Sequence, residues 1–288
     1  MPTCRPRSRP SWVASGASAR WSPEVSVLRT RLISGLILAP LFLLIVSAGS
    51  PYFDLLVAAI VVAMAIEFTR MDGQEGGKRR ALMAAASLTA VAAASVFGNA
   101  GLALALVFAA TVLVVLADQL AGRRGFAVVQ ATVAYAAIPA ISLVFVMRIG
   151  GTESVYWLLA VVWGTDIGAY AVGRTFGGPK LAPAISPNKT WSGAGGGLVI
   201  GTGAGLGLIA ALNGTVDVTL TLMSSGLSIL TQLGDLFESG LKRRYAVKDS
   251  GGLIPGHGGV MDRFDGLWAA APAAALMCAY FKGGVLTW

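Results

Sequence analysis

The stretch "LISGLILAPLFLLIV", residues 32–46, is apolar on every side of the helix that it would form. A segment of this kind can lie in hydrocarbon because a helix closes all its backbone hydrogen bonds internally, whereas a β-barrel would show short segments of alternating hydrophobicity. The whole chain of 288 residues is 55% hydrophobic and 12% charged, against roughly 25% charged residues in soluble domains. The sequence therefore predicts an all-α, polytopic integral membrane protein.

Apolar runs recur along the chain, each close to the about 20 residues that a helix needs to cross a bilayer. We expect nine transmembrane helices, with approximate spans 32–49, 51–69, 81–97, 101–117, 128–147, 154–173, 192–212, 216–236 and 266–282. If these spans alternate in direction, 20 of the 22 Lys and Arg residues fall on one side, leaving Arg148 and Lys282 on the other. Basic residues collect in cytoplasmic loops, so the N-terminus is expected in the cytoplasm and the C-terminus outside.

Three regions follow from this pattern: a basic, disordered tail over 1–30, N-terminal transmembrane helices over 31–150, and a C-terminal transmembrane region over 151–288 with cytoplasmic loops. The tail has two alternatives, a targeting peptide or a start codon placed too early, with the native chain beginning near Val27. The net charge of +8 reflects this topology and anionic lipid headgroups rather than nucleic acid. Cys4 and Cys278 imply no disulfide framework.

Asp166 and Glu67 are two of the acids that lie within the apolar spans. Asp166 lies in "VVWGTDIGAYAVG", and Glu67 lies near the end of the second span. A carboxylate inside a membrane helix costs about 3 kcal/mol, so it usually faces a polar cavity or a partner. We interpret Asp166 as a site residue, with a structural hydrogen bond to a neighbouring helix as the alternative, and Glu67 as an interfacial or helix-packing group.

The loop "GRTFGGPKLAPAISPNKTWSG", residues 173–193, is rich in groups that donate hydrogen bonds to phosphate oxygens. These groups are Arg174, Lys180, Ser186, Asn188, Lys189 and Thr190. The alternative is an ordinary basic cytoplasmic loop with proline turns. The glycines that follow recur every fourth residue, at Gly193, Gly197, Gly201 and Gly205. They predict one helix face that lets another helix approach closely, rather than a dinucleotide-binding loop.

Charge and glycine are concentrated in "SGLKRRYAVKDSGGLIPGHGGVMDRFDG", residues 239–266. The glycines allow backbone N–H groups to point at an anion, and the lysines and arginines supply positive charge, an arrangement that suits a polyphosphate. Asp262 and Asp265 lie three apart at a helix start and can bind a hard cation such as Mg²⁺; the alternative for Asp262 is a helix N-cap. His257 is the only histidine, which excludes a His-rich metal site.

The same stretch resembles the signature of phosphatidate cytidylyltransferases, also called CDP-diacylglycerol synthases. The matching pattern is S-x-[apolar]-K-R-x4-K-D-x-[small]-x2-[apolar]-P-x-H-G-G-x-x-D-R-x-D, with Ile254 and Pro255 shifted by one position. Upstream, "SPNKTW" and "GTDIGAYAVGRTFG" resemble two further family elements. Ser192 departs from the family, in which many members carry Glu, so a charge role at that position is in doubt.

The resemblance implies transfer of a cytidylyl group from CTP to phosphatidate, with Mg²⁺ and an optional second cation, giving CDP-diacylglycerol and pyrophosphate. The residues expected to be catalytic are Asp235, Asp262, Asp265, Lys248 and His257. The residues expected to bind substrate are Asp166, Ser186, Asn188, Lys189, Thr190, Lys242, Arg243, Asp249 and Arg263. The expected metal ligands are Asp235, Glu238, Asp262 and Asp265.

Two other functions fit parts of this pattern. A transporter for an anionic substrate also uses buried acids and glycine-broken helices, although here the polar residues gather in the C-terminal half. A CTP-dependent lipid kinase would use a similar phosphate site. We expect a multi-pass protein of the cell membrane, or of the inner membrane in a Gram-negative bacterium, with its site facing the cytoplasm. The expected partners are CTP, phosphatidate and membrane lipids, a second copy of the chain in a homodimer, and no nucleic acid.

Overall fold

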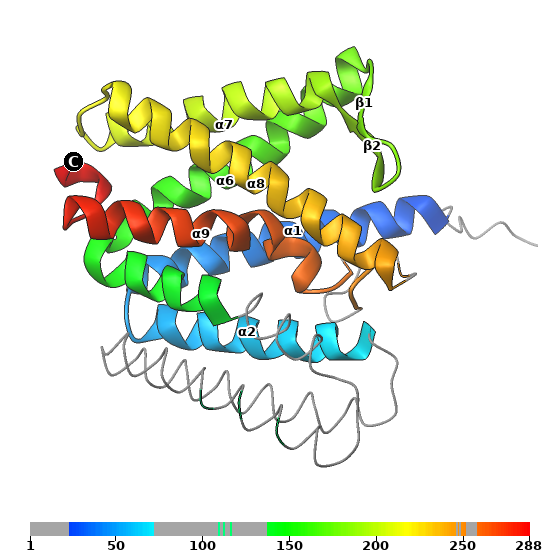
Figure 1. Cartoon of the computed structure of the whole chain (residues 1–288), viewed down its shortest axis with the longest axis horizontal. Coiled ribbons are helices and arrows are strands. Elements are labelled where there is room, and N and C mark those ends of the chain that lie inside the picture. Colours follow the sequence, from blue (N-terminus) through cyan, green and yellow to red (C-terminus); the bar gives the residue numbers. More distant parts are fainter. Residues whose placement is uncertain are drawn as a thin grey trace, which may run out of the picture.

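The computed structural model describes residues 23–71, 109, 112, 116, 137–245, 247, 249–251 and 258–288. The described chain is mostly helical (Figure 1). Its long helices are α1 (Pro23–Ala48), α2 (Tyr52–Met71), α6 (Gly151–Phe176), α7 (Trp191–Ala211), α8 (Val218–Arg244) and α9 (Met261–Phe281). Each of these helices coincides with a predicted span. The predicted spans 81–97 and 101–117 lie outside the described residues, apart from isolated positions.

Shorter elements complete the chain. A helix over 137–145 runs into the π-helix η1 (Val146–Gly150). The chain turns at Gly151, the first residue of α6, whose φ is 75°. A 3₁₀ turn, η2 (Val285–Thr287), lies near the C-terminus. Glycine is suited to the turn because positive φ brings no steric penalty without a Cβ atom.

The described chain is mostly helical, as predicted, with an exception in the loop between α6 and α7. Here β1 (Lys180–Ala182) and β2 (Ser186–Thr190) form an antiparallel hairpin, with Lys180 opposite Thr190 and Ala182 opposite Ser186. Pro183 and Pro187 made a strand improbable from sequence, since proline cannot donate to a ladder. The hairpin forms because the ends of α6 and α7 hold its ends together, and the Trp191 N–H donates to Pro179 O at 3.1 Å.

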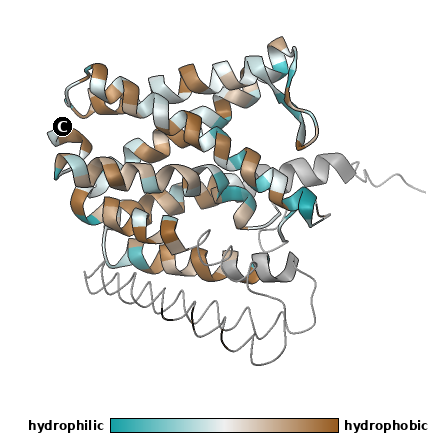
Figure 2. Ribbon diagram, viewed as in Figure 1, coloured by the Kyte–Doolittle hydropathy of each residue, from teal (hydrophilic) through white to brown (hydrophobic). Residues whose placement is uncertain are grey.

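Three described segments are long and apolar enough to cross a membrane: Ala137–Phe176, Trp191–Ala211 and Met261–Thr287. Apolar residues dominate the helices, and polar residues gather where the hairpin and the C-terminal end of α8 lie (Figure 2). Large apolar side chains also point outward, including Val199 at 71% and Leu276 at 71% exposure. A surface of this kind suits a lipid environment.

The glycine face of α7 packs directly against the backbone of α6, as predicted. A Cβ atom on Gly193, Gly197 or Gly201 would lie 2.8 to 2.9 Å from a carbonyl oxygen of α6. The carbonyls belong to Ala169, Thr165 and Val161, which are also four residues apart. The two helices therefore approach along a continuous line at which no side chain fits.

Hydroxyl and amide groups attach α8 to this pair. The Thr165 hydroxyl donates to Ser228 Oγ at 2.7 Å, and Trp157 Nε1 donates to Ser224 Oγ at 3.0 Å. The Gln232 side-chain amide donates to Ala194 O at 3.2 Å. These buried bonds fix how α8 faces α6 and α7, and so how the polar end of α8 is presented.

We predict that Gly197→Ala lowers stability by about 1–3 kcal/mol, because its methyl group meets the Thr165 carbonyl rather than a side chain that could move. Gly203→Ala on the same helix is the matched control, since a Cβ there meets nothing within 4 Å. Thermal unfolding of the two variants in detergent measures the difference. Equal unfolding temperatures would contradict the close-packed interface.

Candidate active site

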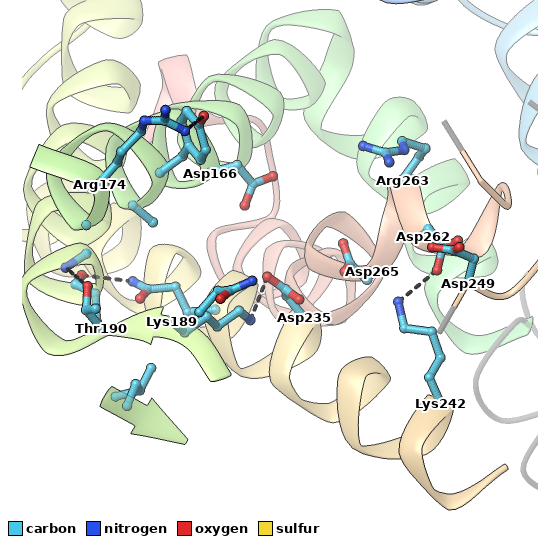
Figure 3. Close-up of a pocket in the computed structure, with 18 residues that line it drawn as sticks. Asp166, Arg174, Lys189, Thr190, Asp235, Lys242, Asp249, Asp262, Arg263 and Asp265 are labelled. Atoms are coloured by element: carbon cyan, nitrogen blue, oxygen red, sulfur yellow. Dashed lines mark hydrogen bonds and ion pairs between the residues drawn. The ribbon is translucent and has the colours of Figure 1, made fainter. Parts of the chain in front are cut away.

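The hairpin and the adjoining ends of α6, α7, α8 and α9 enclose a cavity of about 760 Å³ (Figure 3). Ten of the residues predicted to form the site line it. They are Asp166, Asn188, Lys189, Thr190, Asp235, Lys242, Asp249, Asp262, Arg263 and Asp265. Segments that are far apart in the sequence thus supply one polar chamber at the end of an apolar bundle.

The hairpin side of the cavity is held by the start of α7. The Thr190 hydroxyl accepts a hydrogen bond from Gly193 N at 3.1 Å and so caps α7. The Ser192 hydroxyl donates to Gly177 O and bonds to Thr190 Oγ1, which ties the two ends of the hairpin together. Ser192 therefore has a structural contact in place of the acid common in the resembling family.

Arg174, one of the predicted phosphate donors of the loop 173–193, also lines the cavity. Its Nη1 donates to the Tyr170 hydroxyl at 3.0 Å, and its guanidinium lies 5.9 Å from the centre of that ring. Tyr170 therefore holds a positive charge on the α6 side of the chamber, on the same helix as Asp166 (Figure 3).

Lys189 and Asp235 form an ion pair across the cavity. Their Nζ and Oδ2 atoms lie 2.6 Å apart, joining β2 to α8, and both side chains are partly exposed. An ammonium group can bind phosphate oxygens, and a carboxylate can bind a divalent cation. The pair thus places one positive and one negative charge at the same point of the chamber.

A second cluster surrounds Lys242. Its Nζ lies 2.7 Å from Asp262 Oδ1 and 3.0 Å from Glu238 Oε1. Asp262 also accepts hydrogen bonds from Gly259 N at 2.9 Å and from Ser250 N at 3.1 Å. Asp262 therefore organises the glycine-rich loop and lines the cavity as well. It is not the N-cap of α9, because that position is Val260, which makes no side-chain cap bond, and Asp262 lies within the first turn.

Glu238 and Lys242 follow the end of the predicted span 216–236. Burial raises the pKa of Glu238 to about 9, and Asp265 adds to this effect while Lys242 opposes it. Burial alone would lower the pKa of Lys242, but Glu238 and Asp262 raise it above its usual value. Lys242 consequently stays charged, which is the state needed to bind a phosphate.

Asp265 faces the same chamber from the next turn of α9. Its Oδ1 accepts a hydrogen bond from Gly266 N at 2.7 Å, and the charges of Asp235 and Asp166 act on it. Within the described residues, no group of three or more His, Cys, Asp or Glu side chains is arranged to hold a metal ion. Mg²⁺ needs only one or two carboxylates when phosphate oxygens and water complete its shell, so the oxygen donors present fit this ion.

Other predicted residues lie elsewhere. Glu238 is fully buried and, like Ser186, does not line the cavity. Arg243 also lies outside the lining and donates from Nε to Ile185 O at 3.3 Å. Lys248 and His257 lie outside the described residues, so their predicted roles remain predictions.

Sequence reasoning missed the role of Glu67. This carboxylate of α2 is fully buried and accepts hydrogen bonds from Val260 N and Met261 N, both at 2.9 Å. It also accepts one from the Ser250 hydroxyl at 3.1 Å. An acid inside an apolar span was the available signal, the same one that pointed to Asp166. Its bonds fix the start of α9, from which Asp262 and Asp265 enter the cavity.

A family model for the cytidylyltransferase family matches residues 29–281. The phosphatidate cytidylyltransferase of Brucella suis biovar 1 (strain 1330) is 39% identical over 262 residues, which cover 89% of this chain and 95% of that protein. The enzyme of the same name from Bacillus subtilis (strain 168) is 44% identical over 133 residues, 46% of this chain and 49% of that protein. The chain therefore belongs to the cytidylyltransferase family.

We predict that Glu67→Gln destabilises the start of α9. The amide keeps the shape but replaces one accepting oxygen with a donor, which leaves a buried N–H unpaired at a cost of about 1–3 kcal/mol. The unfolding temperature in detergent should fall. Glu153→Gln, at an exposed acid in the first turn of α6, should leave it unchanged. If the two variants unfold alike, Glu67 does not hold α9.

Proposed function

We propose that this chain is a phosphatidate cytidylyltransferase, which makes CDP-diacylglycerol and pyrophosphate from CTP and phosphatidate. The cavity carries the proposal, since it brings Lys189, Lys242 and Arg263 to one chamber with three or more aspartates. Such a chamber suits two phosphate-bearing substrates and a divalent cation. The relative from Brucella suis, which this chain matches over nearly its whole length, is a phosphatidate cytidylyltransferase.

The reaction requires two polyanions to meet. An oxygen of the phosphatidate phosphate forms a bond to the α-phosphorus of CTP while the bond to the pyrophosphate oxygen breaks, and pyrophosphate leaves with the electron pair. The attacking oxygen is already anionic, so the protein needs chiefly to position the groups and offset their charge. A Mg²⁺ ion held by aspartates of the cavity would supply positive charge that offsets the negative charge developing on the leaving pyrophosphate.

Each residue has a proposed part in this scheme. Lys189 and Lys242 would bind phosphate oxygens of CTP and of the leaving pyrophosphate. Asp235 and Asp265 would hold Mg²⁺, with Asp262 near them and shared with Lys242. Arg263 would bind the lipid phosphate, and the Asn188 side-chain amide would donate hydrogen bonds from the hairpin side, where Thr190 caps α7.

The enzyme is proposed to lie in the cell membrane with nine spans, its N-terminus and active site facing the cytoplasm, where CTP is present. The three segments that are long and apolar enough to cross a bilayer support membrane insertion. The distribution of Lys and Arg supports the orientation. The homodimer and the second cation remain predictions.

Purified protein given CTP, phosphatidate and Mg²⁺ should release pyrophosphate and CDP-diacylglycerol. A lipid kinase would release CDP instead, and a transporter would release neither.

Asp265→Asn should lower turnover about 100-fold or more with an unchanged unfolding temperature, because it removes charge needed around the cation. Full activity in this variant, with an unchanged Mg²⁺ requirement, would show that Asp265 does not hold the cation.

Lys189→Ala should raise the Michaelis constant for CTP roughly 10- to 100-fold, because a charge-assisted contact with phosphate is lost. Lys180→Ala is the matched control. Lys180 is exposed on β1 of the same hairpin and does not line the cavity. Steady-state kinetics at varied CTP compares the two, and equal constants would assign Lys189 to the general positive charge of the loop.

The orientation of the chain in the membrane can be measured with cysteines introduced one at a time into a Cys4→Ser background. Ala184→Cys, at the exposed tip of the hairpin, should resist an impermeant thiol reagent added to intact cells. Thr215→Cys, in the exposed loop between α7 and α8, should react. The reverse labelling pattern would place the active site on the outer face.

A further inference from the structure

A second hollow, of about 490 Å³, adjoins the polar cavity at Arg263, which lines both. We call it the apolar groove. It lies among α1, α2, α6 and the start of α9, and Arg263 is the one charged residue in its lining. The other lining residues are Gly35, Leu38, Ala39, Leu41, Phe42, Ile45, Leu56, Ala59, Ile60, Ala63, Leu159, Val162, Trp163, Val260, Phe264 and Leu267.

The first two turns of α9 face both spaces. Asp262 and Asp265 line the polar cavity, while Phe264 and Leu267 line the apolar groove. Arg263, between Asp262 and Phe264 in the sequence, contributes to both linings. The start of α9 therefore joins a polar chamber to an apolar space, as a molecule with a phosphate head and a hydrocarbon tail requires.

The walls of the apolar groove are fixed by aromatic contacts. The Phe42 ring lies 5.9 Å from the Phe264 ring and 6.5 Å from the Trp163 ring, centre to centre. Phe264 also packs at 5.8 Å against the buried Trp268. Toward the outside, Leu38 and Leu41 are 43% and 49% exposed, so the groove is bordered by side chains open to the surroundings.

A third hollow, of about 360 Å³, also adjoins the polar cavity, but at Asp265. Its remaining lining residues, from 138–139, α8 and α9, carry no charge. A carboxylate at the junction would repel a lipid phosphate, whereas the guanidinium of Arg263 can bind one through two parallel hydrogen bonds. Charge complementarity thus favours the apolar groove over this third hollow.

We propose that the apolar groove binds an acyl chain of phosphatidate while Arg263 holds the phosphate at the edge of the polar cavity. The proposal rests on the proposed function and adds where the lipid substrate binds. The lipid would enter the groove from the side of α1 and α2. Its phosphate would reach CTP in the polar cavity, next to Asp262 and Asp265.

Leu41→Trp should narrow the groove and lower kcat/KM for dipalmitoyl phosphatidate about tenfold. It should leave kcat/KM for dihexanoyl phosphatidate and the Michaelis constant for CTP unchanged. Leu44→Trp is the matched control, one turn further along α1, exposed and outside the groove lining. Equal losses for both chain lengths, or equal effects of both variants, would overturn the proposal.

Photo-crosslinking separates this proposal from the proposed function, because it needs no turnover. Phosphatidate with a diazirine on its acyl chain should label peptides from 35–45 and 264–267 of the wild-type protein. Unlabelled phosphatidate should suppress the labelling and phosphatidylcholine should not. Labelling confined to other helices, or equal competition by phosphatidylcholine, would overturn the proposal even if the purified enzyme makes CDP-diacylglycerol. Specific labelling in a protein that makes no CDP-diacylglycerol would support the lipid site and contradict the proposed function.

Discussion

A carboxylate on α2 determines where α9 begins. The first N–H groups of a helix have no partner within it, and among apolar helices little water is present to bind them. Glu67 accepts two of these groups, at Val260 and Met261, from a position 193 and 194 residues away in the chain. Its third bond, from Ser250, holds the glycine-rich loop against the same point. The polar cavity depends on this connection, because α9 supplies two of its aspartates and its arginine.

Four charged residues of the cavity form two ion pairs, which lower the cost of placing charge beside apolar helices. Lys189 offsets Asp235 and Lys242 offsets Asp262, each across a different pair of elements. The same pairs hold the hairpin to α8 and α8 to α9. On binding, the lysines could contact substrate phosphates and the aspartates could contact a cation in place of each other. Each charge would then keep a partner of opposite sign.

Much of the helical architecture could be predicted from hydropathy, since an apolar run of sufficient length has few alternatives in a bilayer. The packing of α7 on α6 was also readable, because glycines at every fourth residue have a single geometric meaning on a helix. The hairpin was not, since its strands depend on where two helices end rather than on the preferences of proline-containing segments. Most of the site was indicated by charged residues in a signature, whereas Glu67 was undervalued because its partners are backbone groups, which a sequence pattern does not reveal.

The glycine line between α6 and α7 has a mechanical consequence. Two backbones in direct contact along several turns cannot slide or separate without losing all their contacts together, so the pair forms a single stiff unit. Asp166, Arg174 and Thr190 belong to that unit and keep fixed mutual positions. The contact with α8 changes along its length: hydroxyl and amide bonds at Ser224, Ser228 and Gln232 hold α8 to the pair, whereas at the chamber the contact is made by long side chains such as Lys189 that can rotate. Widening of the chamber would therefore occur as a hinge movement of α8 and α9 against a rigid α6–α7 frame.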